Sequence, residues 1–571
     1  MTRLKKLNRS YLRKVFTLKT VFYPLVLLLI STGRAERFEK IINKIIRWFG
    51  VKKNFHYFIK FRDSGRWFRN KFIIANENIA GEILFPSMTG VHSNFTLLNL
   101  LFAQYFWKRY GLKPLLYICN SAFDICTKDG MIKSRRKYPW FCHECFNGYK
   151  YIEQNTGIEI IWMKHQAEHF DNIVSNEIEK INKLESLTEC IGYTYNGQNI
   201  GLFAKKSVMR YFLTGKLAGT REVISVYREF ILAALKYSLA FEKTIKERPH
   251  LKYVIINNGT LAFEALARFH CEKHGIPYIT YETYIGNNSL IYKRNGAVMD
   301  LDWSREYEKF RKKIHVDKEC RKIVDGFFEG LRKGVGMYAV LNREHMADRL
   351  KDSGKYVCLF TNLNYDTAVI DKNHLFPDME GWIYSVINYW KERRPGITLV
   401  IRIHPGEIKL VTASREYLGE RIIKACAGVS QIIVFDSTDK VNSYELIKNM
   451  EYGLVYASTI GLEIAWSGKT CVVAGLPWFR NEPFVLYPAL QEEYFSYIEK
   501  LNNGEFSFKP DIEELYRKIY FVYFNRLKRL NGIKLYTPAE EANSVYNNPE
   551  EMINNNIEFF EEFRDELFGK E

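Results

Sequence analysis

Two short motifs in the second half of the chain combine polar side chains that suit phosphate binding. They are Arg402-Ile403-His404-Pro405-Gly406-Glu407 and Ala457-Ser458-Thr459-Ile460-Gly461-Leu462-Glu463. The imidazole of His404 and the hydroxyls of Ser458 and Thr459 can donate hydrogen bonds to a phosphate, and backbone N–H groups at a helix start favour the same anion. Glu463, one turn further on, is within reach of a ribose whose phosphate lies at the helix start. The two motifs therefore predict a cradle for a nucleotide monophosphate or diphosphate.

Both motifs also have ordinary structural interpretations. Ser-Thr before a helix is a common N-cap, and a His before Pro can simply end a strand. The phosphate interpretation gains weight because each motif coincides with the end of an apolar, strand-like run, at residues 398–403 and 452–456. In an open α/β sheet, ligands bind outside the carboxyl ends of the strands. His404 is then placed to donate to the same phosphate, or to a departing phosphate oxygen.

Alternating strand and helix patterns predict two α/β halves. Expected strands are 82–86, 114–119, 253–256 and 277–282 in the first half, and 356–360, 398–403, 431–435, 452–456 and 470–474 in the second. Strand, turn, helix and strand at this spacing indicate parallel sheets. We expect two Rossmann-like, doubly wound domains that face a cleft, with helical extensions at both ends. The expected segments are a basic arm (1–70), a first domain with a linker helix (71–335), a second domain (336–508) and C-terminal helices (509–571).

The composition is that of a large globular protein, with 47% hydrophobic and 15% aromatic residues. Global disorder is therefore excluded, and the lack of a run of about 20 apolar residues makes an ordinary membrane-spanning helix unexpected. No Walker motif, metalloprotease motif or nucleophile elbow occurs. Asp300-Leu301-Asp302 matches a D-x-D metal-binding pattern, but three-letter patterns arise by chance and this one precedes the predicted linker.

Positive charge is concentrated at the start of the chain. The sequence holds 83 Lys and Arg against 65 Asp and Glu, a net +18, and residues 1–60 contain 15 of the cations but only 2 of the anions. The rest is nearly neutral, which argues against a general nucleic-acid-binding protein. Cations interleaved with apolar residues favour an arm on an anionic membrane surface. A cleaved signal peptide and an arm packed on its own domain are the alternatives; the apolar run 21–30 is interrupted by Pro24.

Four cysteines in the first half lie close together in sequence. They are Cys119, Cys126, Cys142 and Cys145. Four thiolates can bind a structural zinc ion, although the spacing of the first pair is not that of a standard zinc knuckle. A cluster of buried thiols and a redox dithiol are the alternatives. With 10 cysteines in 571 residues the chain is too cysteine-poor for a disulfide scaffold, which indicates a reducing compartment.

The sequence resembles the capsule polysaccharide biosynthesis glycosyltransferases, which have the two-domain GT-B architecture. The resemblance spans about residues 80–500 and rests on Arg402–Glu407, Asn442-Ser443-Tyr444, Val455–Gly475 and Leu359–Asp366, and in the first half on Asn258-Gly259 and Tyr281-Glu282. The motifs are also similar to those of bacterial sialyltransferases, Kdo transferases and teichoic-acid glycerophosphotransferases. Two departures from the family pattern, Tyr365 before Asp366 and Thr283 after Glu282, put the acceptor side in question.

The resemblance implies roles for the residues of the two motifs. His404, Ser458 and Thr459 would hold the donor phosphate, and Glu463 would bind the ribose. Arg402, Glu407 and Ser443, which lie in the same segments, are further candidate substrate-binding residues. Helix dipoles and cationic side chains such as Arg402 would take the place of a metal ion, so no cofactor is expected for catalysis.

The first half would then bind the acceptor and supply a general base, which an inverting transfer requires. Glu282 and His92 are the candidates; alternatively, Glu282 binds a neighbouring backbone group or Arg, and His92 packs at a helix start. Asn258 and Gly259 follow a strand, where glycine permits close approach of a ligand or merely forms a turn. Asp366 is expected to shape the cleft from the other side.

These features together predict a glycosyltransferase. It would transfer a sugar from a nucleotide-sugar donor to a growing surface polysaccharide or its lipid-linked acceptor, at the inner face of the cell membrane, to which the basic arm attaches it peripherally. A CDP-polyol phosphotransferase of the teichoic-acid type would use the same phosphate cradle and is one alternative. A non-catalytic polysaccharide assembly factor is the other. No nucleic-acid partner is expected.

Overall fold

The computed structural model describes residues 78–88, 94–126, 140–285, 288–333, 350, 354–366, 369–409, 417–535 and 543–569. Residues 73–571 form one compact unit. The predicted basic arm and the candidate base His92 lie outside the described residues. Within the described part of the chain, every helix is too short or too polar to cross a membrane.

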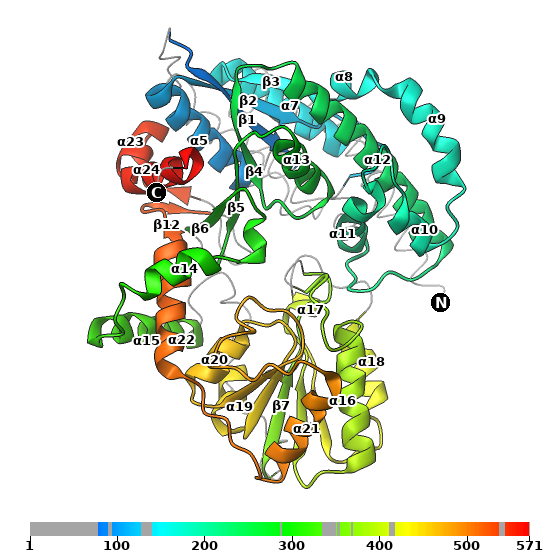
Figure 1. The fold of residues 1–571 in the computed structure, drawn as a ribbon, viewed down its shortest axis with the longest axis vertical. Coiled ribbons are helices and arrows are strands. Elements are labelled where there is room, and N and C mark those ends of the chain that lie inside the picture. Colours follow the sequence, from blue (N-terminus) through cyan, green and yellow to red (C-terminus); the bar gives the residue numbers. More distant parts are fainter. Residues whose placement is uncertain are drawn as a thin grey trace, which may run out of the picture. The chain divides into compact units, whose positions relative to one another are not determined.

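The first sheet has seven strands in the order β12-β6-β5-β4-β1-β2-β3 (Figure 1). Their bounds are β1 (Gly81–Ser87), β2 (Leu112–Ile118), β3 (Glu159–Trp162), β4 (Leu251–Asn257), β5 (Tyr278–Thr283), β6 (Ser289–Arg294) and β12 (Lys528–Arg529). Strands β1 to β5 are parallel to one another, whereas β6 runs antiparallel to β5, and β12 runs antiparallel to β6. Parallel strands covered on both faces have continuous apolar runs, which is why β1, β2 and β4 were detectable in the sequence.

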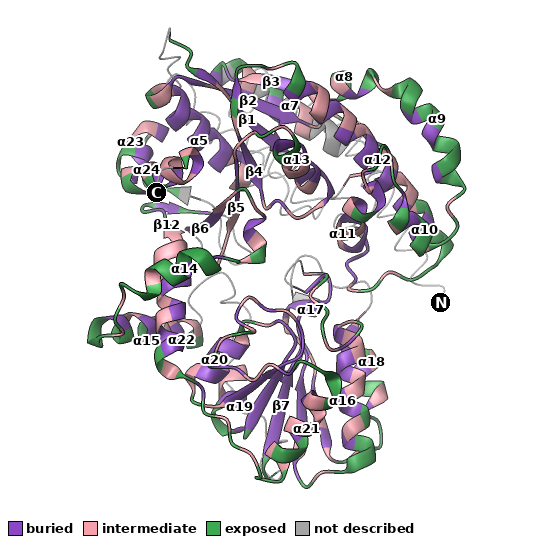
Figure 2. Ribbon diagram, viewed as in Figure 1, coloured by how far each residue is buried: buried purple, intermediate pink, exposed green. Residues whose placement is uncertain are grey.

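Helices cover both faces of the first sheet. Those that precede β6 in the chain are α5 (Asn94–Tyr110), α7 (Trp140–Thr156), α8 (Met163–Glu168), α9 (Asp171–Asn182), α10 (Leu187–Gly192), α11 (Ile200–Phe212), α12 (Arg221–Lys246) and α13 (Ala262–Lys273). Tyr278 of β5 is buried in one core with α12 and α13, whereas Tyr281, on the opposite face of the strand, contacts Phe102 of α5. Figure 2 shows the strands buried and the outer helix α9 mostly exposed.

The second sheet has five parallel strands in the order β11-β10-β7-β8-β9. The strands are β7 (Tyr356–Phe360), β8 (Thr398–Arg402), β9 (Ile432–Phe435), β10 (Tyr452–Val455) and β11 (Thr470–Val473). The associated helices are α16 (Met379–Arg393), α17 (Gly406–Lys409), α18 (Leu418–Ala425), α19 (Ser443–Asn449), α20 (Ile460–Trp466) and α21 (Gln491–Asn502). Each of the five strands occupies a segment predicted from its apolar run, and the mixed α/β class with parallel sheets is confirmed. The division into two domains facing a cleft, and its boundaries, remain predictions.

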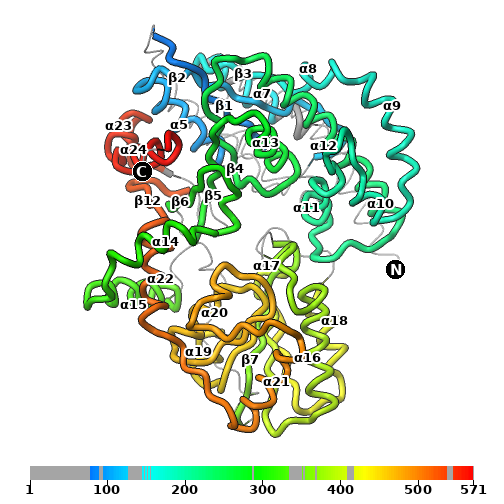
Figure 3. Tube along the Cα trace, viewed as in Figure 1, coloured from blue at the N-terminus to red at the C-terminus, as the bar shows by residue number. Residues whose placement is uncertain are grey.

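The C-terminal segment returns to the first sheet. Its elements are α22 (Ile512–Tyr520), a π-helical turn (Phe521–Arg526), β12, β13 (Ile533–Lys534), β14 (Asn543–Ser544), α23 (Pro549–Asn554) and α24 (Ile557–Phe568). Strands β13 and β14 pair with each other in a small antiparallel sheet. The predicted apolar face of the last helix packs on the protein: Phe563 stacks on Phe102 of α5, with ring centroids 4.2 Å apart. Figure 3 shows α23 and α24, in red, beside α5, and β12 beside β6.

Two helices, α14 (Ser304–Arg311) and α15 (Lys318–Arg332), lie where one linker helix was predicted at the end of the first domain, over 305–335. A 3-10 turn (Val298–Asp300) precedes them. Asp302 of the D-x-D pattern accepts hydrogen bonds from the backbone and hydroxyl of Ser304, the first residue of α14, at 3.3 and 2.7 Å. Asp300 forms an ion pair with Lys372 at 3.7 Å. Both carboxylates therefore have local partners.

Candidate functional site

The residues directly after β7 connect the two predicted phosphate motifs. Strand β7 lies between β8 and β10, so the segments that follow all three strands meet at one edge of the sheet. The hydroxyl oxygen of Thr361 accepts the backbone N–H of His404 at 2.9 Å. The side-chain carbonyl of Asn362 accepts the backbone N–H of Ala457 at 3.4 Å. Thr361 and Asn362 are only 2% and 9% exposed. Their buried hydrogen bonds connect both motifs to the end of β7.

His404 is a neutral hydrogen-bond donor in this arrangement. Burial, and to a lesser extent the charge of Arg402, lowers the imidazole pKa to about 4. The backbone N–H of Gly406 donates to Nδ1 at 3.0 Å, so the single proton of the neutral ring is on Nε2. Among the described residues, Nε2 has no hydrogen-bond partner, and the ring is half-buried. The geometry leaves one oriented N–H available to a ligand.

Ser458 and Thr459 begin α20 in different ways. The Ser458 hydroxyl oxygen accepts the backbone N–H of Ile460 at 3.4 Å, a weak local cap. Thr459 is the residue that precedes the helix, but its side chain forms no capping hydrogen bond, and it is exposed. Thr459 thus occupies the N-cap position without a side-chain cap, and Ser458 makes one local turn hydrogen bond. Both O–H groups remain able to donate to a ligand.

Glu463 lies one turn into α20 with its carboxyl group largely shielded from water. Burial raises its pKa to about 7, although the phenol of Tyr444 and the positive charge of Arg332 oppose the rise. Its Oε2 atom is buried and has no partner among the described residues. A buried acceptor without a donor is costly, and a sugar hydroxyl is a group that would satisfy it.

Arg402 and Glu407, both predicted to contact the donor, support the backbone instead. The guanidinium of Arg402 donates to the carbonyl oxygens of Asp436 and Val441, at 2.5 and 3.4 Å, and the side chain is 2% exposed. Glu407 is 1% exposed and accepts the backbone N–H of Gly419 at 3.4 Å. Burial raises its pKa to about 7. These two side chains hold the loop after β9 and the first turn of α18.

Ser443 is the first residue of α19 and is half-buried. The preceding Asn442 caps this helix, because its side-chain oxygen accepts the backbone N–H of Tyr444 at 2.9 Å. Tyr444 in turn contacts Glu463 through its phenol group. Ser443 therefore begins the helix that supplies the neighbour of the predicted ribose-binding carboxylate.

Glu282 is the next-to-last residue of β5 and accepts hydrogen bonds from three donors. The side-chain amide of Asn258 donates to Oε2 at 2.7 Å, while the backbone N–H and hydroxyl of Thr283 donate to Oε1 at 2.9 and 3.2 Å. Burial nevertheless raises its pKa to about 7, and the carboxylate of Asp366, after β7, adds to the rise. Asp366 and Glu282 are thus electrostatic neighbours. The role of Asp366 in shaping a cleft stays a prediction.

The Asn258-Gly259 pair forms a tight turn after β4. Both residues have left-handed backbone angles, with φ of 56° and 81°. A Cβ atom on Gly259 would lie 2.6 Å from Thr280 Cγ2 and 2.9 Å from Arg268 Cδ. The glycine is therefore required by packing, which favours the turn interpretation, while Asn258 contacts the candidate base directly.

Sequence reasoning missed three residues of this site. Thr361 and Asn362 lie in the segment Leu359–Asp366, but no role was predicted for them. Their position directly after a predicted strand is the sequence feature that could have indicated one. Glu264 of α13 is 8% exposed, its Oε2 has no partner among the described residues, and burial raises its pKa to about 7, with a further contribution from Glu282. Its place in a helix of ordinary composition gives no sequence signal.

The predicted zinc cluster is only partly described. Cys119, Cys126 and Cys145 are half-buried, and the side chain of Cys142 lies outside the described residues. The four-thiolate site therefore stays a prediction.

Known proteins offer weak likenesses to this chain. No protein-family profile and no curated protein matches it. A β-Kdo 2,4-transferase, KpsC from Thermosulfurimonas dismutans, is 12% identical, with a TM-score of 0.33 over 53% of this chain and 88% of that chain. The β-Kdo 2,7-transferase KpsC of the same organism is 13% identical, with a TM-score of 0.31 over 55% and 88%. A UDP-GlcNAc 2-epimerase from Neisseria meningitidis, bound to UDP-GlcNAc, is 8% identical, with a TM-score of 0.22 over 83% and 99%. Similarity at these scores carries no functional argument.

Proposed function

We propose that this protein is a glycosyltransferase that transfers a sugar from a nucleotide-sugar donor to a growing surface polysaccharide or its lipid-linked acceptor. One observation carries the proposal: Thr361 and Asn362 hold the His404 and Ser458 segments at the carboxyl ends of neighbouring strands. Ligands of doubly wound sheets bind at this edge. The motif resemblance to capsule polysaccharide glycosyltransferases points to the same site.

The donor phosphate would be bound by neutral donors. His404 offers Nε2–H, and Ser458 and Thr459 offer hydroxyl groups. Preorganised donors in a partly shielded site stabilise the negative charge that develops on the leaving nucleotide phosphate. In this proposal they take the place of a divalent ion, so added Mg²⁺ or Mn²⁺ should leave the transfer rate unchanged. The unpartnered oxygen of Glu463 would accept a ribose hydroxyl.

Glu282 is the proposed general base. A carboxylate with a pKa of about 7 is a far better proton acceptor near neutral pH than an ordinary glutamate, and general bases work best when their pKa lies near the working pH. Ionised Glu282 would take the proton of the acceptor hydroxyl as that oxygen attacks the donor sugar carbon. The Asn258 amide would keep the carboxylate oriented throughout.

The experiment is a binding and transfer assay with a panel of CMP-, UDP-, GDP- and CDP-linked donors. We expect calorimetric binding of one nucleotide class, and His404→Ala and Ser458→Ala should each weaken it about tenfold through loss of one hydrogen bond to an anion. His315→Ala, which removes an exposed imidazole on another segment, is the matched control. Binding that is undiminished in both site variants would contradict the site.

The donor panel also separates the alternative functions. Transfer from a CDP-polyol with release of CMP would identify a phosphotransferase instead. Failure of the intact chain to bind any nucleotide would favour a non-catalytic assembly factor. Both outcomes would overturn the glycosyltransferase proposal.

We further propose that residues 1–60 attach the enzyme to the inner face of the cell membrane, because 15 cations among apolar residues suit anionic lipid. The full chain should then sediment with vesicles containing anionic lipid, with lower binding at high salt. Deletion of residues 1–35 should remove this binding. Equal sedimentation of the deleted and full chains would exclude the arm as the anchor.

A further inference from the structure

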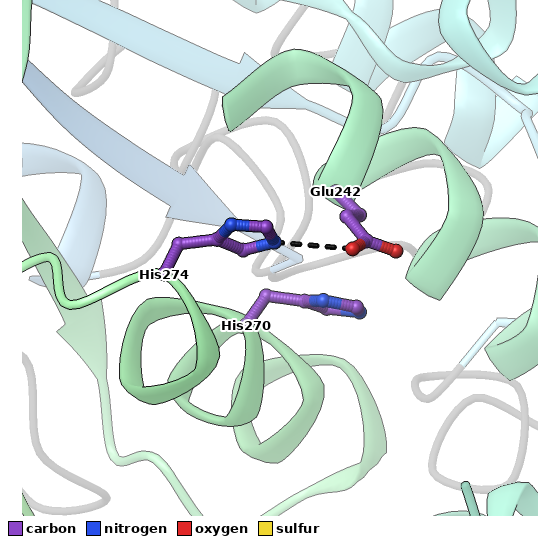
Figure 4. Close-up of side chains that lie close together, drawn as sticks. All are labelled: Glu242, His270 and His274. Atoms are coloured by element: carbon purple, nitrogen blue, oxygen red, sulfur yellow. Dashed lines mark hydrogen bonds and ion pairs between the residues drawn. The ribbon is translucent and has the colours of Figure 1, made fainter. Parts of the chain in front are cut away.

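Three side chains with metal-ligand chemistry converge between two helices that cover the first sheet. Glu242 comes from α12, whereas His270 and His274 lie four residues apart, in α13 and directly after it (Figure 4). One potential ligand atom from each side chain lies within 4.8 Å of the other two. Residues four apart on a helix share a face, so both imidazoles are presented toward α12.

The hydrogen bonds of His270 fix which of its nitrogens is available. The hydroxyl of Ser238 donates its only proton to Oε1 of Gln198 at 3.0 Å. The hydroxyl oxygen of Ser238 lies 2.8 Å from Nε2 of His270. Because its proton is already donated to Gln198, this oxygen must accept the Nε2–H of His270. The neutral ring then has its lone pair on Nδ1. His270 is 1% exposed, and Nδ1 is buried with no hydrogen-bond partner among the described residues.

This arrangement matches the outer shell of metal-bound histidines. A histidine that binds a metal through one nitrogen generally donates its other N–H to a fixed acceptor, which sets the tautomer and the ring orientation. The pair formed by Ser238 and Gln198 fills that role for His270. In the absence of a ligand, a buried lone pair without a donor is a cost to folding.

We propose that Glu242, His270 and His274 form a binding site for a divalent transition-metal ion of the zinc class. Two imidazoles and one carboxylate are a ligand set that Zn²⁺ favours, whereas Mg²⁺ and Ca²⁺ prefer oxygen ligands alone. Water would complete a tetrahedral shell, since Glu242 and His274 have side chains that are 17% and 23% exposed.

Small side-chain movements would complete the site. His274 Nε2 now lies 3.1 Å from Oε1 of Glu242, and the ammonium groups of Lys273 and Lys246 share that oxygen at 2.8 and 3.1 Å. Zinc at about 2.0–2.1 Å from each ligand places ligand atoms about 3.4 Å apart. The atoms of His274 and Glu242 already lie within that distance, and the His270 atom lies within 4.8 Å of both, so only a small shift is needed. The two lysine side chains are 51% and 60% exposed and can move into water.

The bound ion would connect α12 to the C-terminal end of α13. The site is separate from the proposed phosphate cradle and does not depend on the proposed function. Its occupancy can therefore be tested without a transfer assay.

The test is titration of the metal-stripped full chain with Zn²⁺ by calorimetry and with Co²⁺ by visible absorption. We expect one ion per chain, with Co²⁺ bands typical of nitrogen and oxygen ligands. His274→Ala should lower the affinity at least tenfold, because a partly exposed ligand is removed without emptying the core. Lys246→Met should raise it severalfold, because a competing cation leaves Glu242. His315→Ala is the matched control and should change neither the number of ions bound per chain nor their affinity.

The thiols supply the rival outcome. Charge-transfer bands from sulfur to cobalt, or loss of binding in Cys145→Ser, would assign the ion to the cysteine cluster and overturn the proposal. Unchanged affinity in His274→Ala, or no ion bound by the wild-type chain, would also overturn it. A circular dichroism spectrum of His274→Ala that matches wild type ensures that lost binding reflects a lost ligand, and the gain in Lys246→Met provides a second readout that misfolding cannot mimic.

Discussion

The side chain of Thr361 fixes the backbone of His404, with 2.9 Å between its hydroxyl oxygen and the His404 nitrogen. Thr361 follows β7, and His404 follows β8, so this bond joins the ends of two neighbouring strands. This bond fixes the position of the His404 backbone, from which the ring extends. The Gly406 N–H, which donates to Nδ1, determines that the ring proton is on Nε2. Two hydrogen bonds to backbone N–H groups, those of His404 itself and of Gly406, thus set the position and the tautomer of the imidazole that is proposed to bind the phosphate.

Replacing Thr361 by Val should disturb this orientation. Valine keeps the shape but removes the acceptor, which leaves a shielded N–H unpaired at a cost of about 1–3 kcal/mol. We expect nucleotide affinity, measured by calorimetry, to fall about tenfold. Thr361→Ser keeps the hydroxyl and should bind nearly as well as wild type. Equal affinity of the Val variant and wild type would show that the bond has no part in binding.

The proposed base predicts a pH profile. Because the carboxylate of Glu282 is the active form and its pKa is raised to about 7, kcat should rise with pH through that value and level off above it. Glu282→Gln should lower kcat about 100-fold or more while the KM for the donor stays unchanged.

Asp366→Asn provides the matched variant for that profile. The negative charge of Asp366 contributes to the raised pKa of Glu282, so its removal should shift the acid limb of the profile to lower pH. The measurement is kcat across pH 5–9 with saturating donor. An acid limb that persists in Glu282→Gln would assign the titration to another group.

Glu407 predicts a dependence of stability on pH. Its pKa in the folded protein is about 7, above the ordinary value of 4.5, so its ionisation opposes folding. Its contribution is fully present below about pH 4.5 and is lost as pH rises through 7. At about 1.4 kcal/mol per pKa unit, the loss by pH 8 is of the order of 3 kcal/mol.

Glu407→Gln should therefore be more stable than wild type at pH 8 and should lose that advantage at pH 4.5. Urea unfolding at both pH values measures the difference. Glu420→Gln, at an exposed position on α18, should change little at either pH. A Glu407→Gln variant that is destabilised equally at both pH values would instead indicate a lost hydrogen bond to Gly419.

The packing of α24 on α5 predicts a large stability effect. Phe563 is 1% exposed and stacks on Phe102, so Phe563→Ala should lower the free energy of unfolding by about 3–5 kcal/mol. Glu558→Ala, at an exposed position of the same helix, is the control. An effect below about 1 kcal/mol for Phe563→Ala would mean that α24 detaches without cost.

The strands of the parallel sheets could be predicted because they are buried on both faces. Their sequences are short, continuous runs of β-branched and other apolar residues, as in 398–403, and helical patterns separate them. Strands β3, β6 and β12 of the first sheet were not predicted. β12 has only Lys528 and Arg529, and such a pair becomes a strand because β6 offers it a free edge, which local sequence does not reveal.

The candidate site was predictable only as far as backbone position determines it. His404 and Ser458 follow β8 and β10, and Glu282 lies in the last two residues of β5, near the strand ends that the sequence pattern predicted. The direction of a long side chain depends on partners far away in the sequence. Arg402 binds carbonyl groups 34 and 39 residues downstream, and no local pattern distinguishes this role from phosphate binding.

The return of the chain to the first sheet has a consequence for biosynthesis. Lys528 pairs with Leu290, and Phe563 covers a face of the sheet whose first strand begins at Gly81. On the ribosome, β6 keeps an open edge and α5 an uncovered apolar face while more than two hundred further residues are added. Exposed edges and apolar faces of this kind attract other nascent chains, so translation that stalls before Lys528 should yield aggregates unless a chaperone shields the unfinished half.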